Sequence, residues 1–201
     1  MKIDSPINDA MSKVLESDRM ILRPWLFPED REAFFAIYRE PEVTEFLPTI
    51  RRLATSAESL GDFFGQKLRT LRERGNGLDW WAMIDRETGE AIGSIILQNL
   101  PDNAGNLTEE IEIGWHSRRD CWGRGYVTEA ARVILEYGFK TLQLPIIYAV
   151  IHPDNRNSIR VTERLGMRSM GITERYYGQE LRLFAIETGT NATETEYPST
   201  S

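Results

Sequence analysis

The sequence of 201 residues has one cysteine, Cys121, and only two histidines. A single cysteine cannot form a disulfide within the chain, and scarce cysteine is typical of a reducing compartment, so we expect a cytoplasmic protein. These residues are also too few for a usual structural zinc site, and we predict no bound metal. A chain of this length is expected to form one domain whose hydrophobic core is large enough to be stable without a disulfide or a metal.

Long apolar runs are absent too. No stretch approaches the ~20 apolar residues of a membrane helix, and the N-terminal segment MKIDSPINDAMSKV lacks the apolar core of a signal peptide, so we expect no membrane partner. Basic residues are outnumbered, with 24 Lys and Arg against 31 Asp and Glu and a net charge of −7. This balance argues against nucleic acid as a partner and leaves room for a cationic one, such as an amine.

Hydrophobic periodicity organises the rest of the chain. Apolar stripes at helical spacing, with proline, acidic and glycine boundaries, predict helices over residues 28–40, 56–75, 127–142 and 157–166. Alternating or short apolar runs predict strands at residues 19–25, 107–117, 145–151 and 181–188, and a hairpin over residues 79–99. The strand–loop–helix–strand unit over residues 111–151 must cross over right-handedly, so its two strands should be parallel. We assign residues 1–17 to an N-terminal extension, 18–188 to the domain and 189–201 to a disordered tail.

The segment RDCWGRGYVTEA, residues 119–130, places Gly123 and Gly125 directly before a predicted helix. Clustered glycines indicate either a tight turn or the close approach of a ligand. A helix N-terminus attracts anions, and the arginines nearby add basic charge, so a pyrophosphate is the natural ligand. A P-loop is excluded because no lysine follows either glycine, and a Rossmann fingerprint would need a third glycine where Thr128 stands.

Two longer segments carry a family resemblance. RDCWGRGYVTEAARVILEYGF, followed by IHPDNRNSIRVTERLGM, resembles the GNAT acyltransferases, most closely their Rim-type ribosomal-protein N-acetyltransferases. That subfamily shows a W-G-x-G-Y-x-x-E-A loop and helix, then an N-x-x-S helix ending near L-G. The segment RMILRP also resembles its opening strand, and the resemblance covers residues 18–188.

The resemblance implies an α+β fold, with a mixed, mostly antiparallel central sheet and helices on both faces. One parallel strand pair, residues 112–116 and 146–151, should be splayed. It also implies acetyl-CoA, or another acyl-CoA, as donor. The residues that would contact this co-substrate lie on the first parallel strand, on the glycine loop and at the start of the last helix: Ile113, Gly114, Trp115, Arg119, Cys121, Trp122, Gly123, Arg124, Gly125, Tyr126, Asn155 and Ser158.

Several of these positions have a simpler structural interpretation. Asn155 could serve only as a helix N-cap, and Ser158 could bond only to the backbone of the first turn. We interpret Cys121 as part of the loop structure rather than as a nucleophile. Either Trp80 or Trp81 should face the acceptor cleft, although core packing explains both equally well.

Catalytic residues follow from the chemistry of acyl transfer to an amine, which needs orientation of both substrates and removal of a proton. Glu112 is the candidate base; its alternative is a solvated carboxylate on a half-exposed strand. Glu110 shares that strand face and is the second choice, and His116 could relay a proton. Ser158 could donate to the thiol or thiolate. Thr162 occupies the position of a tyrosine that acts as general acid in many GNAT enzymes, so the acid stays unassigned.

The leading functional prediction is direct transfer of an acetyl group, or a longer acyl group, to a primary amine in a ternary complex. The resemblance allows a protein N-terminus, an antibiotic, a polyamine or an amino acid as acceptor, and it allows a homodimer. One alternative is an acyl-CoA-binding sensor or scaffold without catalysis. A nucleotide-binding protein is a third possibility, which the motif mismatches weaken.

Overall fold

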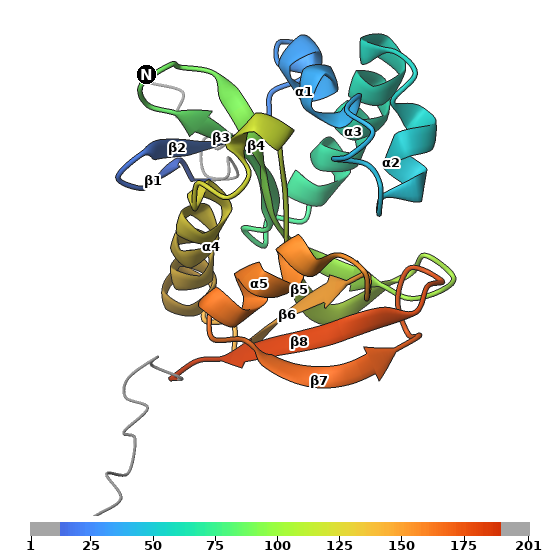
Figure 1. Cartoon of the computed structure of the whole chain (residues 1–201), viewed down its shortest axis with the longest axis vertical. Coiled ribbons are helices and arrows are strands. Elements are labelled where there is room, and N and C mark those ends of the chain that lie inside the picture. Colours follow the sequence, from blue (N-terminus) through green and yellow to red (C-terminus); the bar gives the residue numbers. More distant parts are fainter. Residues whose placement is uncertain (1–12, 190–201) are drawn as a thin grey trace, which may run out of the picture.

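The computed structural model describes residues 13–189 and is built around one twisted sheet (Figure 1). In the described residues the strands are β1 (Leu15–Glu16), β2 (Met20–Pro24), β3 (Asp79–Asp85), β4 (Ala91–Pro101), β5 (Leu107–Ser117), β6 (Ile146–Ile151), β7 (Arg168–Thr173) and β8 (Leu181–Glu187). Their spatial order is β1-β2-β3-β4-β5-β6-β8-β7. Neighbouring strands are antiparallel except β5 and β6, which are parallel as predicted.

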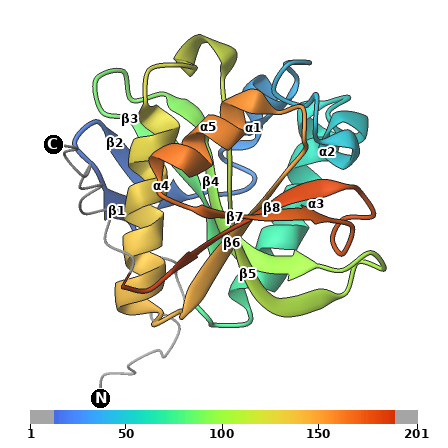
Figure 2. The same cartoon turned by 60° about the horizontal axis from the view of Figure 1, so that its bottom comes forward.

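Helices cover both faces of the sheet, which confirms the expected α+β fold (Figure 2). They are α1 (Arg31–Tyr38), α2 (Pro48–Leu53), α3 (Ala57–Arg72), α4 (Tyr126–Glu136) and α5 (Arg156–Arg164). The first three lie on one side of the sheet, and α4 and α5 lie on the other. No helix within residues 13–189 has both the length and the apolar character of a membrane span.

Adjacent tryptophans on β3 show how the sheet divides the core. Successive side chains of a strand point to opposite faces. Trp80 therefore meets Phe64 of α3, with ring centroids 5.0 Å apart, while Trp81 meets Tyr137 on the α4 side at 5.8 Å. Each such aromatic contact contributes about 0.5–1.5 kcal/mol beyond simple burial.

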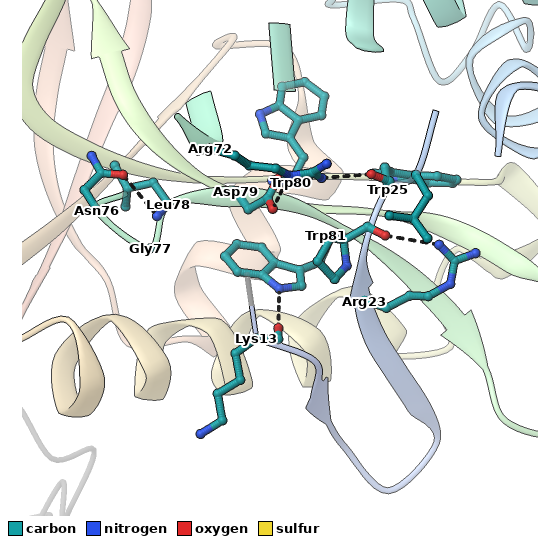
Figure 3. A network of polar contacts seen from close by, with 12 residues as sticks. Lys13, Arg23, Trp25, Arg72, Asn76, Gly77, Leu78, Asp79, Trp80 and Trp81 are labelled. Atoms are coloured by element: carbon teal, nitrogen blue, oxygen red, sulfur yellow. Dashed lines mark hydrogen bonds and ion pairs between the residues drawn. The ribbon is translucent and has the colours of Figure 1, made fainter. Parts of the chain in front are cut away.

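A buried ion pair fastens the end of α3 to the start of β3 (Figure 3). The Nε atom of Arg72 donates to Asp79 at 2.7 Å, and its Nη2 atom donates both to Asp79 at 3.0 Å and to the carbonyl of Trp25 at 2.8 Å. The Asp79 side chain is 0% exposed. These hydrogen bonds of the Arg72 guanidinium fix the position of α3 against the sheet. They thereby also fix the position of the α3 face that carries Phe64.

Two strands and one α-helix of the described residues were not predicted from the sequence. β1 is only two residues long and α2 only six, which is too short for periodicity to be recognised. β7 is exposed along nearly its whole length and therefore has no apolar alternation. The predicted helix over residues 127–142 ends earlier as α4, and a π-type turn, η2 (Tyr137–Thr141), continues it. The predicted N-terminal extension, residues 1–17, includes β1, which pairs with β2. Residues 190–201 of the predicted tail lie outside the described residues.

Candidate active site

The parallel strands β5 and β6 separate almost as soon as they meet. Their register contains one residue pair, Glu112 with Tyr148, after which β5 continues alongside β4 and β6 alongside β8. A cleft of about 770 Å³ opens where they part. The splayed pair predicted from the resemblance is therefore present, and it leaves an unpaired stretch of the β5 edge at residues 113–117 facing the cleft.

The glycine loop forms the mouth of α4 at one end of this cleft. Gly123 and Gly125 have φ values of 72° and 81°, in the left-handed region that side chains disfavour, and Gly125 is the N-cap of α4. A Cβ at Gly123 would meet no atom within 4 Å, so backbone conformation rather than crowding requires glycine here. No side chain caps the first turn of α4, which leaves its N–H groups available to an anion.

The arginines around the loop differ in whether their guanidinium groups are already paired with a carboxylate. Arg118 pairs with Glu90 and Asp120, and Arg119 pairs with Glu42. Arg124 has no ion pair within residues 13–189, and its guanidinium lies 5.1 Å from the centre of the Tyr126 ring. Arg124 is thus the arginine of the loop whose charge is free for a phosphate.

Cys121 and Tyr126 anchor the loop. The Cys121 thiol is buried, and this burial, followed by its contact with Asp120, raises its pKa to about 11. It is therefore protonated and a poor nucleophile near neutral pH. The Tyr126 hydroxyl donates to Asp85 at 2.6 Å and ties the start of α4 to the end of β3.

The first turn of α5 faces the loop from the other side of the cleft. Asn155 caps this helix by accepting from the Ser158 N–H at 3.1 Å, and it also lines the cleft. The Ser158 hydroxyl accepts from the Trp115 indole at 3.2 Å, which links α5 to β5. Thr162 is fully buried and donates to the Ile159 carbonyl at 2.7 Å, so its hydroxyl is not presented to the cleft.

Glu112 lies deep in the cleft on β5 and is 6% exposed, so the alternative of a solvated surface carboxylate is wrong. Its Oε1 atom accepts from Gln98 at 2.7 Å and from the hydroxyl of Tyr177, and Gln98 in turn accepts from the Trp80 indole at 2.8 Å. Burial raises the pKa of Glu112, and the two hydrogen bonds and the charge of Lys67 oppose that rise. A carboxyl with a raised pKa is a stronger base than an exposed one.

The other two predicted proton carriers lie in different surroundings. Glu110 forms an ion pair with Arg175 at 2.8 Å and does not line the cleft. His116 does line it, and its Nδ1 atom contacts the Tyr38 hydroxyl at 2.9 Å. Burial and the neighbouring charge of Lys67 lower the His116 pKa to about 3, so the imidazole is neutral at physiological pH. Within residues 13–189 no group of three or more His, Cys, Asp or Glu is arranged to hold a metal ion.

The cleft collects most of the residues selected from the sequence. Of the candidate co-substrate contacts, all line it except Arg119 and Arg124; of the candidate proton carriers, Glu112, Ser158 and His116 line it and Glu110 does not. Trp80 also lines it, whereas Trp81 faces the opposite side of the sheet (Figure 3). Sequence reasoning missed Tyr177, Gln98 and Lys67. The sole signal at Tyr177 is structural, a φ of 59° in a residue other than glycine, and such strain often accompanies a functional position.

Comparison with known proteins identifies the class. A family model described as "Acetyltransferase (GNAT) domain" matches residues 19–168. The chain belongs to this family and is a GNAT N-acetyltransferase, an acyltransferase of a family that uses acetyl-CoA.

Among individual relatives, the uncharacterized protein YkkB of Bacillus subtilis is 33% identical over 76% of this chain and 84% of its own length. The uncharacterized N-acetyltransferase YoaA of the same organism is 29% identical over 84% of this chain and 90% of its own. Among solved structures, RimJ of Mycobacterium smegmatis in complex with CoA-disulfide superposes with a TM-score of 0.70 at 20% identity, covering 89% of each chain. At that identity the likeness establishes the fold.

Proposed function

We propose that this protein transfers an acetyl group from acetyl-CoA directly to a primary amine, with both substrates bound together. The acceptor is a small-molecule amine or the N-terminal amine of a protein. The observation that carries the proposal is the position of Glu112, a buried carboxylate in the same cleft as the mouth of α4.

The donor half of the cleft suits CoA. The free N–H groups at the start of α4, the left-handed glycines and the Arg124 charge can hold the pyrophosphate. The free edge of β5 at Ile113, Gly114 and Trp115 can pair with the amides of the pantetheine arm. The other proposed contacts are the remaining loop residues and the start of α5: Arg119, Cys121, Trp122, Tyr126, Asn155 and Ser158.

Glu112 would accept a proton from the incoming ammonium and so release the amine lone pair. The amine nitrogen then bonds to the thioester carbonyl carbon, the carbon–sulfur bond breaks, and the second proton of the nitrogen passes to the departing sulfur, so that CoA leaves as the thiol. Ser158 is the candidate donor of a hydrogen bond to the departing sulfur, because its hydroxyl accepts from Trp115 and keeps its own hydrogen free. General acid–base assistance of this kind contributes about 10²–10⁴-fold.

The test is turnover of acetyl-CoA against a panel of peptides, amino acids, polyamines and aminoglycosides. We expect thiol release that depends on the amine, with the acetylated product identified by mass spectrometry. A non-catalytic sensor would bind acetyl-CoA and release no CoA with any amine. That result would overturn the proposed function while leaving the family assignment intact.

A further inference from the structure

Lys67 lines the cleft near Trp80 and Phe64, in the part that we call the acceptor half, and has no hydrogen-bond or ion-pair partner in the described residues. It projects from α3, and its ammonium lies 4.4 Å from the centre of the Trp80 ring and 5.5 Å from that of Phe64. The structure gives it no hydrogen bond and no ion pair with any residue in 13–189. Most of its surface is covered. An ammonium withdrawn from water normally requires an anion or several acceptors.

The charge of Glu112 interacts with that of Lys67 through the cleft, since each shifts the pKa of the other. No direct ion pair joins them in the described residues, and the Glu112 Oε1 atom accepts instead from Gln98 and Tyr177. The cleft therefore presents the Lys67 ammonium and the Glu112 carboxylate without a direct ion pair between them. An acceptor with an ammonium and a nearby anion would neutralise both.

Apolar side chains line the same cleft as this pair of charges. Phe46 and Phe63 line the cleft, as Phe64 and Trp80 do, and Phe46 stacks on His152 at a ring distance of 4.8 Å. Phe63 is 42% exposed although it is aromatic, and it lies next to Phe64 at a ring distance of 5.3 Å. These side chains offer an apolar surface to the remainder of an acceptor.

We propose that Lys67 binds a carboxylate of the acceptor, and that the acceptor is a small amine carrying this carboxylate beside its amino group and an apolar or aromatic body, as in an aromatic α-amino acid. The inference rests on the proposed function and deepens it. The acceptor ammonium gives one proton to Glu112, its nitrogen bonds to the acetyl carbonyl carbon, the carbon–sulfur bond breaks, and the second proton passes from the nitrogen to the departing sulfur, so that CoA leaves as the thiol. A polycation is disfavoured because it would place positive charge against Lys67.

A binding experiment tests the proposal without turnover. N-acetyl-L-phenylalanine and N-acetyl-L-phenylalaninamide have nearly the same shape, but only the first has a carboxylate. Each is titrated calorimetrically into the CoA-saturated protein. We expect the acid to bind about tenfold to hundredfold more tightly than the amide, as for a hydrogen bond to a charged group. Equal binding of the two probes, or binding of neither, would overturn the proposal.

Variants of Lys67 distinguish binding of the carboxylate by this lysine from a general effect of its charge on Glu112. Lys67→Met should abolish the preference for the acid, and Lys67→Arg should retain most of it. Lys140→Met, which removes a lysine paired with Glu136 on the surface, should leave it unchanged. Because the negative charge of Glu112 repels a carboxylate, it cannot produce a preference for the acid over the amide. Persistence of the preference in Lys67→Met would refute the assignment.

Turnover separates this inference from the function on which it rests. If phenylalaninamide or spermidine is acetylated more efficiently than phenylalanine, the carboxylate inference fails and the acetyltransferase proposal stands. If CoA binds and no amine is acetylated, the proposed function fails. The probe titration then still decides whether Lys67 recognises a carboxylate.

Discussion

Replacing Glu112 by glutamine should make the protein slower and more stable at the same time. Glutamine keeps the side-chain shape, and its Oε1 atom can still accept from Gln98 and Tyr177, but it cannot take a proton. Loss of general-base assistance should lower the rate by about 10²–10⁴-fold near neutral pH. This corresponds to about 2.7–5.4 kcal/mol of transition-state stabilisation. The deficit should shrink at high pH, where solvent deprotonates the amine.

The effect on stability has the opposite sign. Burial raises the Glu112 pKa in the folded state above its value in the unfolded chain. For a carboxyl shifted in this direction, stability is greatest below the unfolded-state pKa and is lost as pH rises through the folded-state pKa. Glu112→Gln removes that loss. The variant should therefore melt at a higher temperature than the wild type at neutral pH, and the difference should fade on acidification.

The measurements are thiol release from acetyl-CoA over a range of pH and thermal unfolding over the same range. Glu109→Gln is the matched control, because Glu109 is an exposed carboxylate on the same strand, and it should change neither quantity. If Glu112→Gln keeps more than about a third of the activity at neutral pH, Glu112 is not the base. If the variant melts at a lower temperature at neutral pH, the argument from burial is wrong.

Three further predictions concern the loop, the last helix and the core. Millimolar CoA should raise the melting temperature, with about 2.7 kcal/mol of stabilisation at a hundredfold excess over Kd. Gly125→Val should weaken CoA binding far more than Gly89→Val, because Gly89 has a similar left-handed φ but lies in the β3–β4 turn. Equal weakening by the two variants would show that the glycine loop is only a turn. Thr162→Ala should keep most of the activity in a thiol-release assay, because the hydroxyl is buried against a carbonyl, and a loss of several hundredfold in a folded variant would contradict this. Arg72→Met should lower the free energy of unfolding by about 3 kcal/mol, or the melting temperature by roughly 6–12 °C in calorimetry, because it removes the guanidinium from the buried Asp79 carboxylate. A loss below about 1 kcal/mol would contradict the importance given to this ion pair.

The sequence by itself determined the elements whose reasons are local. Glycines at 123 and 125 are required by the left-handed backbone that each adopts, which can be inferred from their place before a helix. The parallel arrangement of β5 and β6 follows from the strand–helix–strand order of the chain. Alternation along β5 placed Glu112 on the face opposite Ile113, although it could not distinguish a solvated face from a buried one.

Only the tertiary structure decided what surrounds Glu112. Tyr177 lies 65 residues further along the chain and Lys67 lies 45 residues before it, so no periodicity connects them. Their convergence depends on sheet register, on the position of α3 and on the strained backbone of one turn. These contacts set the burial and the charge of the carboxylate, because desolvation and Coulomb interactions depend on distance in space and not on separation along the chain.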